Sequence, residues 1–335
     1  MAAAIRAMRQ AACDDIPLTI YYAFKQSEAA DEGISSAGWS AFLQAVVDGG
    51  LVVDGTWPLR TELGNRMISM GTNALASSVV LVCRKRLVSA ASITRAEFVR
   101  ALKRELPDAL AKIRAAGIQA VDFQQAAIGP GMGVFSRYAR VLEADDSPMT
   151  VRTALALINT LIEELASEQD GAYDTDTQAA LAWFQSFGWT ERPSGELINL
   201  ATAKNTSLDG LRRAGVFATR DGKARLVGRA ELPPDWSPAS DDRLTLWDAA
   251  QHLARILDAE HGGIDAAARL LHGLGSRGPE VLPLVYRLYQ IADYRKEPAE
   301  ALIWNRLATE WPTLESRAGE FEETEPKGAP TLFDL

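Results

Sequence analysis

The sequence predicts a mixed α/β protein in which a short sheet is followed by a longer region that is mostly helical. Two observations support this prediction. Three short apolar runs within residues 18–83 have the length of strands, and the segment between the first two shows helical spacing of its apolar residues. After residue 90, helical spacing recurs almost throughout, and one Asp-Gly pair between two short apolar runs indicates a β-hairpin.

The predicted sheet contains strands at residues 18–24, 51–57 and 77–83. Its helix spans residues 38–47 and ends at Gly49-Gly50. The first run is almost wholly apolar, so we expect a strand that is covered on both faces in a parallel sheet. No helix separates the last two runs, which favours an antiparallel pairing between them.

Composition sets limits on the class of protein. The chain has 335 residues, 47% of them hydrophobic and 24% charged, which is typical of globular proteins, and a net charge of −9 gives no long-range attraction to phosphate. It lacks an apolar run of the length of a membrane span, and its start is too short in apolar length for a secretory signal. Cys13 and Cys83 provide no disulfide framework, so a cytoplasmic location is expected. The three histidines, His252, His261 and His272, are scattered, and we expect no metal site.

Several short motifs carry a resemblance to a known family. They are Tyr21-Tyr22-Ala23-Phe24-Lys25-Gln26, Gly38-Trp39, Thr56-Trp57-Pro58-Leu59-Arg60-Thr61-Glu62, Asn65-Arg66-Met67, Asn73-Ala74-Leu75-Ala76-Ser77-Ser78, Ala127-Ile128-Gly129-Pro130-Gly131-Met132, Phe135-Ser136-Arg137-Tyr138 and Trp311-Pro312. In these motifs the chain resembles the closing section of the large prokaryotic adenine-specific DNA methylases, the multidomain kind that has a zinc ribbon near its start and is associated with phage defence. The resemblance extends over nearly the whole chain but only over the carboxyl-terminal part of the family's length.

The resemblance implies that residues 1–90 are the terminal portion of a Rossmann-like class I methyltransferase domain with an incomplete sheet. The complete enzyme would use S-adenosylmethionine, which such enzymes bind with an F-x-G-x-G turn, and would hold the target base with an Asp/Asn-Pro-Pro-Tyr/Phe loop. The sequence has neither motif. We therefore expect no cofactor binding by this chain alone and no catalytic residue in it. The expected partners are DNA and the missing amino-terminal half or a partner subunit.

The carboxyl ends of the predicted parallel strands give candidate DNA-binding residues, because the active crevice of an α/β sheet lies there. They are Lys25, Gln26, Trp57, Arg60, Asn65 and Arg66. Trp57 has the chemistry to stack on a base and Arg60 to bind a phosphate. The alternative is structural: Trp57-Pro58 forms a packed corner, and Arg60 pairs locally with Glu62.

The run Gly129-Pro130-Gly131-Met132-Gly133 lies within a predicted helical connector, residues 91–170. A glycine-rich loop before a helix can bind an anion through free N–H groups. The spacing matches no nucleotide-binding fingerprint, however, and Pro130 lacks a donor. A structural turn and an anion or nucleic-acid contact therefore both remain open.

Residues 171–230 are predicted to form a winged-helix-like module: a helix from Asp174 to Gly188, two short helices and then a hairpin turning at Asp221-Gly222. Between residues 204 and 229 there are seven basic residues against two acidic ones. The basic ones are Lys204, Arg212, Arg213, Arg220, Lys223, Arg225 and Arg229. We select Arg212, Arg213, Lys223 and Arg225 as candidate DNA contacts, and a protein-interaction or structural role is the alternative.

The remaining chain is predicted to form a helical bundle over residues 231–312 and a disordered acidic tail over residues 313–335. Two functions from different classes therefore compete. In the first, the chain is the carboxyl-terminal portion of an adenine-specific DNA methyltransferase that is inactive without its cofactor-binding half. In the second, it is a non-enzymatic DNA- or protein-binding module of a phage-defence locus.

Overall fold

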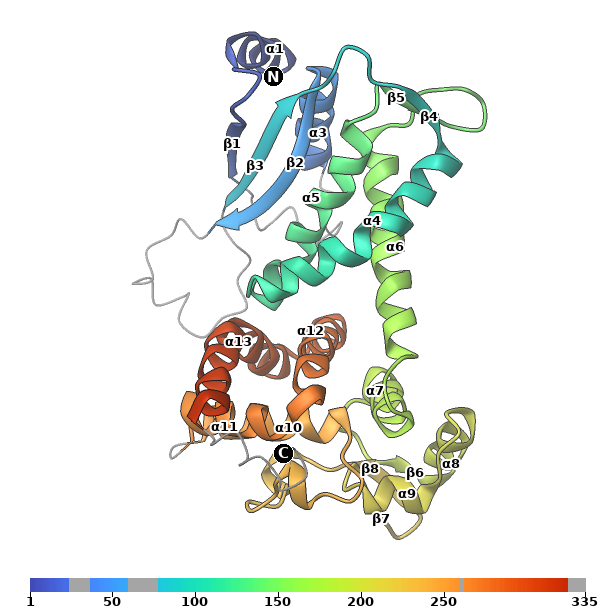
Figure 1. Cartoon of the computed structure of the whole chain (residues 1–335). Coiled ribbons are helices and arrows are strands. Elements are labelled where there is room, and N and C mark those ends of the chain that lie inside the picture. Colours follow the sequence, from blue (N-terminus) through green and yellow to red (C-terminus); the bar gives the residue numbers. More distant parts are fainter. Residues whose placement is uncertain (24–36, 60–77, 260–261, 325–335) are drawn as a thin grey trace, which may run out of the picture. The chain divides into compact units, whose positions relative to one another are not determined.

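The computed structural model describes residues 1–23, 37–59, 78–259 and 262–324, with no side-chain description for residues 322–324. The chain forms two compact units, Met1–Glu168 and Gln169–Leu335. Figure 1 shows a mixed α/β protein with three small sheets and many helices, which confirms the coarse fold class. The boundary between the units lies close to the predicted boundary between the helical connector and the winged-helix-like module.

The sheet of the first unit contains β1 (Leu18–Ala23), β2 (Leu51–Leu59) and β3 (Ser78–Lys85), and α3 (Ala37–Asp48) lies between the first two strands in sequence. The strand order is β1-β3-β2, and β3 is antiparallel to both neighbours. It follows that β1 and β2 run parallel to each other on either side of β3. The predicted strands, helix and antiparallel pairing of the last two strands are confirmed.

The expectation that the first strand is covered on both faces is wrong. Inward and outward residues alternate along β1, because it is the edge strand of an antiparallel pair and only one of its faces packs. On the packed face, the Tyr22 ring stacks on Phe42 of α3 with ring centroids 4.6 Å apart. On the other face, Tyr21 is 66% exposed.

The predicted glycine-rich loop is part of a helix. A single 3-10 turn (Ala120–Asp122) leads into α5 (Phe123–Ser136), which continues through Pro130, and Gly129 and Gly131 are buried within it. This helix packs against β2, and its Ser136 Oγ accepts a hydrogen bond of 2.9 Å from the Val53 N–H. The glycines therefore allow a helix to approach a strand closely. The two alternatives predicted for residues 129–133, a structural turn and an anion-binding loop, are therefore both wrong.

The first unit also contains α1 (Ala2–Ala11), β4 (Ser92–Thr94), α4 (Arg95–Ala115), β5 (Arg140–Leu142) and α6 (Val151–Asp170), whose last residues enter the second unit. A capping box formed by Thr94 and Glu97 opens α4. The parallel pairing of β4 with β5 was not predicted. Pro148 forms a bridge with Leu142, and α6 begins after it at Val151.

The second unit begins with a small module of α7 (Thr175–Phe187), β6 (Arg192–Pro193), α8 (Ser194–Ala203), α9 (Leu208–Arg213), β7 (Phe217–Arg220) and β8 (Lys223–Leu226). The predicted hairpin is confirmed. Asp221 and Gly222 both have positive φ, 51° and 75°, as a two-residue type I′ turn requires. The short strand β6 adds to this hairpin and gives the order β6-β8-β7, which the sequence did not predict.

The rest of the second unit is helical: α10 (Leu246–Asp258), α11 (Ile264–Gly273), α12 (Gly278–Tyr294) and α13 (Pro298–Thr324), with 3-10 turns at Arg229–Glu231, Pro238–Ser240 and Gly275–Arg277. These helices lie where the sequence predicts a helical bundle. The predicted end of the last one at residue 312 is wrong, because α13 continues to Thr324 and buries Leu314 after Pro312. Trp247, Tyr286 and Trp304 are fully buried in this region.

Candidate functional site: a pocket beside helix α10

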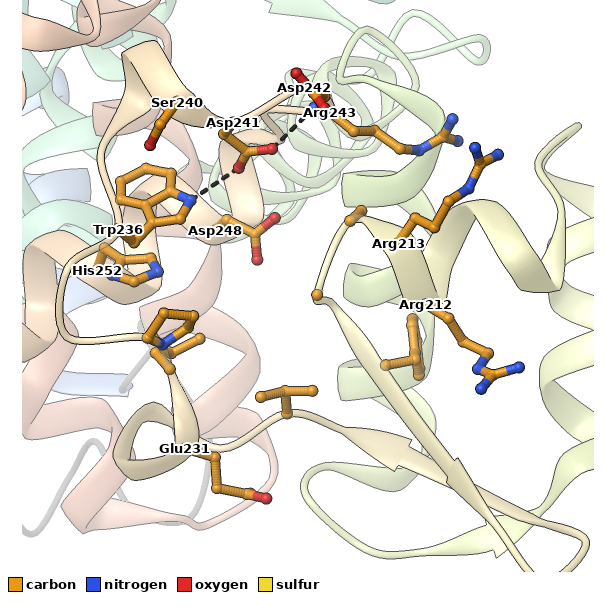
Figure 2. Close-up of a pocket in the computed structure, with 16 residues that line it drawn as sticks. Arg212, Arg213, Glu231, Trp236, Ser240, Asp241, Asp242, Arg243, Asp248 and His252 are labelled. Atoms are coloured by element: carbon orange, nitrogen blue, oxygen red, sulfur yellow. Dashed lines mark hydrogen bonds between the residues drawn. The ribbon is translucent and has the colours of Figure 1, made fainter.

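The second unit contains an open pocket of about 700 Å³, shown in Figure 2. One side is formed by the end of α9 and the start of β7. The other is formed by the segment that leads into α10 and by α10 itself. Its apolar lining consists of Ala214, Phe217, Val227, Leu232 and Pro233. This volume is in the range of sites for small organic ligands, which combine apolar walls with a few polar groups.

Asp248 is a buried carboxyl group that lines this pocket. Thr245 caps the amino terminus of α10 through the Asp248 N–H, and its hydroxyl donates a 2.7 Å hydrogen bond to Asp248 Oδ2. The residue is only 4% exposed. Burial raises the Asp248 pKa from 3.8 to about 8, and the nearby carboxylates of Asp241, Asp174 and Asp176 act in the same direction. The group is therefore mostly a neutral carboxylic acid at pH 7, with one donor and one acceptor face.

His252 follows one helical turn after Asp248 and lines the same pocket. Its ring lies flat against the indole of Trp236, with ring centroids 4.0 Å apart and an interplanar angle of 9°. Within the described part of the chain, its buried Nδ1 has no hydrogen-bond partner. Burial, together with the charge of Arg255, lowers the His252 pKa from 6.5 to about 4, so the ring is neutral at pH 7.

Trp236 is held in place by its own polar edge. Its Nε1 donates a 2.8 Å hydrogen bond to Asp241 Oδ2, and Asp241 Oδ1 accepts one from the Arg243 N–H (Figure 2). The Arg243 guanidinium makes two hydrogen bonds to Asp176, of 2.6 and 3.1 Å. The Trp236 indole is thus held in a fixed position in the wall of the pocket, because its hydrogen-bond partner Asp241 is itself bonded to the Arg243 N–H.

Two residues that the sequence selected as DNA contacts, Arg212 and Arg213, also line this pocket. Both extend from α9 toward solvent, and in Figure 2 their guanidinium groups point away from Asp248. Arg212 lies 3.9 Å from Asp209, a weak exposed pair. Among the residues described, Arg213 has no ion-pair partner. These two cations are therefore available to an anion outside the pocket.

Other members of the predicted basic cluster are neutralised within the protein. Lys223 pairs with Glu191 at 3.0 Å, and Arg225 makes two hydrogen bonds to Glu231. Arg229 is mostly buried and pairs with Glu300, and its guanidinium lies over the rings of Trp189 and Trp304. The charge count made from the sequence covered residues 204–229 only. It therefore missed the three acidic partners, Glu191, Glu231 and Glu300, which lie outside that range.

Sequence reasoning missed the three residues at the centre of the pocket: Trp236, Asp248 and His252. The pattern Thr245-x-x-Asp248 indicates a helix start, but it does not show that the carboxyl group is buried. Trp236 fell within the predicted helical bundle of residues 231–312 without a role, and His252 was counted among scattered histidines. The fold brings them together with Arg212 and Arg213.

Of the residues predicted at the strand ends, only Trp57 lies in the described part of the chain. It is 51% exposed, on the same sheet face as Tyr21. Trp57 and Tyr21 both pair with Val80 of β3, from opposite sides, so the three side chains form one row across the sheet. Lys25, Gln26, Arg60, Asn65 and Arg66 lie outside the described residues, and so does the proposed Arg60–Glu62 pair.

The described ranges of the chain contain no cluster of three or more His, Cys, Asp or Glu side chains able to hold a metal ion. Within the same ranges, no helix has both the length and the apolar composition needed to span a membrane.

Fold and pocket together define a mixed α/β protein with a helical second unit that carries a partly apolar, partly ionisable pocket. Comparison with known families gives one match: residues 174–332 are similar to a domain of unknown function, DUF8807. That match falls within the second unit. No curated protein and no solved structure is significantly similar to the chain.

Proposed function

We propose that this chain is the carboxyl-terminal portion of an S-adenosylmethionine-dependent, adenine-specific DNA methyltransferase, in which it supplies the end of the catalytic sheet and DNA-binding helical regions. The observation that carries the proposal is the arrangement of β1, α3, β2 and β3. Two parallel strands joined by a helix, with a following strand antiparallel to both, are the form in which a class I methyltransferase sheet ends.

The exposed side of this small sheet supports the proposal. Within the described residues, β1 pairs with β3 alone, so its outer edge meets no other described strand. The Tyr21–Val80–Trp57 row leaves two large aromatic side chains exposed on one face. Unpaired strand edges and exposed apolar patches are usually covered by another chain segment. Strands of a cofactor-binding half, added beside β1, would pair with its open edge.

In this proposal the two halves have different tasks. The cofactor-binding half holds S-adenosylmethionine and the base-positioning loop, and the present chain contributes the neighbouring wall. Trp57 lies near the carboxyl end of β2 and Tyr21 near that of β1, the side of an α/β sheet at which ligands bind. Methyl transfer to an amine depends mainly on positioning, so exposed aromatic groups there would support a flipped base.

The small module of the second unit supports a DNA-binding role. Its order α7-β6-α8-α9-β7-β8 places two short helices before a hairpin, in keeping with a winged helix. Arg212 and Arg213 on α9 are exposed, and contacts from such residues to phosphate position a protein on DNA without reading sequence.

Reconstitution tests the proposal. The chain is mixed with the product of a neighbouring or upstream reading frame that encodes F-x-G-x-G and a Pro-Pro-Tyr loop. S-adenosylmethionine binding is measured by calorimetry, and methyl transfer is measured on adenine-containing DNA. We expect no heat from the chain alone, and both binding and transfer from the mixture. Binding of S-adenosylmethionine by the chain alone, or lack of association between the two, would overturn the proposal.

A matched pair of variants tests the surface involved. Tyr21→Ser with Trp57→Ser should weaken association of the halves at least tenfold. Leu87→Ser with Val88→Ser should leave it unchanged, because these residues are similarly exposed (75% and 99%) but lie beyond the end of β3. Equal loss in both pairs would show that the sheet face has no specific role.

One observation favours the second function, a non-enzymatic DNA- or protein-binding module. The second unit is compact by itself, and the match to the domain of unknown function DUF8807 falls within it. If the second unit alone binds DNA as tightly as the whole chain, and no cofactor-binding partner associates with the first unit, this second function holds.

A further inference from the structure

We propose that Arg243 is a positioning residue for DNA binding: it holds helix α9 in place, and α9 carries the two exposed cations Arg212 and Arg213. The inference rests on the DNA-binding role proposed above for the second unit and adds a residue on which that role depends. Arg243 lies outside the module of α7 to β8, in the segment that leads into α10. The anchor of α9 therefore comes from a different part of the chain.

Helix α9 is too short to be held by its own backbone hydrogen bonds. It has only six residues, Leu208–Arg213, and helices of this length are not stable in water without tertiary contacts. Its Leu211 side chain is fully buried, which fixes one side of the helix. The Arg212–Asp209 pair lies within α9 itself, so it cannot fix the helix relative to the rest of the unit. A second contact has to set the direction of the helix.

The second contact joins Gly210 of α9 to the guanidinium group of Arg243. A Cβ atom at position 210 would lie 2.7 Å from Arg243 Nη2 and 3.1 Å from Arg243 Cζ. The guanidinium therefore lies directly against the main chain of α9. Gly210 also donates its N–H to the hydroxyl of the helix cap Ser207, at 3.0 Å. The turn of the helix that contacts Arg243 is thus the turn that starts α9.

The Arg243 guanidinium is itself held by Asp176, in the first turn of α7. Its Nε and Nη2 donate to the two carboxylate oxygens at 2.6 and 3.1 Å, a two-bond geometry that is strong and directional. The hydroxyl of Thr206, the residue before the α9 cap, donates to the same carboxylate. Asp176 is only 4% exposed. One buried carboxylate therefore holds both the guanidinium and the chain that enters α9.

The main chain of Arg243 is fixed as well. Its N–H donates to Asp241 Oδ1 at 2.8 Å, and Asp241 Oδ2 accepts a bond of 2.8 Å from Trp236 Nε1. Figure 2 shows the Asp241 carboxylate between Trp236 and Arg243. Because both its main chain and its guanidinium are anchored, Arg243 makes a rigid contact with α9.

A fixed helix matters for DNA binding because two phosphate contacts have to form at once. If α9 could move, its order would have to be gained on binding, and that loss of conformational freedom lowers affinity. Anchored by Arg243, the helix presents Arg212 and Arg213 in one arrangement before DNA arrives. Arg243 thus acts through α9, without a phosphate contact of its own.

The structural part of the proposal is tested without DNA, by amide hydrogen exchange and mass spectrometry. In Arg243→Ala and in Asp176→Asn, the amides of α9 should exchange about tenfold faster than in the unchanged chain, because local opening becomes easier. Those of the hairpin β7–β8 should not change, which shows that the fold is kept. Arg306→Ala is the matched control, since Arg306 is also an exposed arginine paired with an acid, Asp258. Unchanged exchange of α9 in the first two variants would overturn the anchoring role.

DNA binding is tested on the full chain by fluorescence anisotropy with a duplex. Arg243→Ala and Asp176→Asn should weaken binding about fivefold or more, as expected for lost preorganisation. Arg306→Ala removes the same charge as Arg243→Ala and should change affinity less than about twofold. Asp176→Asn separates positioning from direct contact, because it leaves the Arg243 cation in place and Asp176 itself is buried. Equal or tighter binding by Asp176→Asn would overturn the proposal.

A double-mutant cycle decides whether Arg243 acts through α9. In a chain that already carries Arg212→Ala and Arg213→Ala, Arg243→Ala should cause no further loss of affinity, since no cation remains for it to position. The same loss in both backgrounds would show an independent contribution and overturn the assignment. If the unchanged chain binds DNA and Arg243→Ala has no effect, this inference alone fails. If the unchanged chain does not bind DNA, the DNA-binding role proposed above fails with it.

Discussion

Gly129 of α5 lies directly against the backbone of Thr56 in β2. A Cβ atom at position 129 would lie 2.5 Å from the Thr56 amide nitrogen and 2.5 Å from its Oγ1. The Thr56 hydroxyl in turn donates to the carbonyl groups of Gln125 and Ala126 in the preceding turn of α5. Helix and strand therefore meet through their main chains at this point, which only glycine permits.

Replacement of Gly129 should destabilise the first unit strongly. In Gly129→Ala, the new methyl group would push α5 away from β2, and the overpacking should cost about 1–3 kcal/mol, with more if the Thr56 hydrogen bonds are lost. Urea denaturation followed by circular dichroism measures the change in the free energy of unfolding.

The control is Gly55→Ala, one residue away from Thr56 in β2. A Cβ at Gly55 would meet nothing within 4 Å, so this change should alter stability by less than about 0.5 kcal/mol. Similar losses in the two variants would show that close approach of the backbones is not the reason for the glycine at position 129.

Glu300 should be needed to keep Arg229 in the interior of the second unit. Its carboxylate accepts from the Arg229 guanidinium (2.9 Å for one of the two bonds) and from the indoles of Trp304 and Trp189, at 2.8 and 3.2 Å. Glu300→Gln would leave a buried cation without its counter-charge. Breaking such a pair costs about 3–5 kcal/mol, which thermal unfolding should register as a large loss of stability.

Glu231→Gln is the matched control, because Glu231 also makes two hydrogen bonds to an arginine, Arg225, but on the surface. This change should cost about 1 kcal/mol or less. If Glu300→Gln is no more destabilising than Glu231→Gln, burial does not determine the strength of the Arg229–Glu300 pair.

Asp248 should make the stability of the second unit fall as pH rises. Its folded pKa, about 8, lies above the ordinary aspartate value of 3.8, so between these pH values the folded state holds a proton that the unfolded state has lost. Stability then decreases by about 1.4 kcal/mol per pH unit. The unfolding free energy of Asp248→Asn minus that of the unchanged chain should therefore increase between pH 5 and pH 8 and level off above it.

His252 does not disturb this comparison. Its pKa is lowered from 6.5 to about 4, so it contributes stability that is lost as pH falls from 6.5 through 4, and it does so equally in both proteins. Urea titrations at each pH, followed by tryptophan fluorescence, give the difference. A difference that does not change with pH would mean that Asp248 is ionised in the folded protein.

Arg212 and Arg213 should contribute more to DNA binding than Lys223 and Arg225 do. The first two are exposed without strong partners, whereas the others are paired with Glu191 and Glu231. Arg212→Ala with Arg213→Ala should reduce the slope of log K against log salt by about 2, since each phosphate contact releases about one counterion. Fluorescence anisotropy on a duplex at several salt concentrations measures that slope.

The matched pair Lys223→Ala with Arg225→Ala should reduce the slope less. Each of these cations already pairs with an acidic side chain, Glu191 or Glu231, and is therefore less available to a phosphate. Equal slopes for both pairs and for the unchanged chain would remove α9 as a DNA-binding element.

The sequence by itself determined the local structure. Apolar runs marked β1, β2 and β3, and Asp221-Gly222 marked the hairpin turn. These signals depend on neighbours within a few residues, so a single sequence carries them in full. The antiparallel pairing of β2 and β3 was also predictable, because nothing in the sequence indicated a helix between the two apolar runs.

Only the tertiary structure decided the role of residues whose partners lie far away in sequence. Gly129 was expected in a loop, and the structure shows it in a helix against Thr56. Arg229 was counted among the basic residues of a possible DNA-binding cluster, but Glu300, 71 residues further on, holds it inside the second unit. Trp236, Asp248 and His252 form one pocket only because the loop before α10 folds back onto it. Burial and long-range pairing set pKa values and available charge, and neither property can be obtained from residue type and spacing alone.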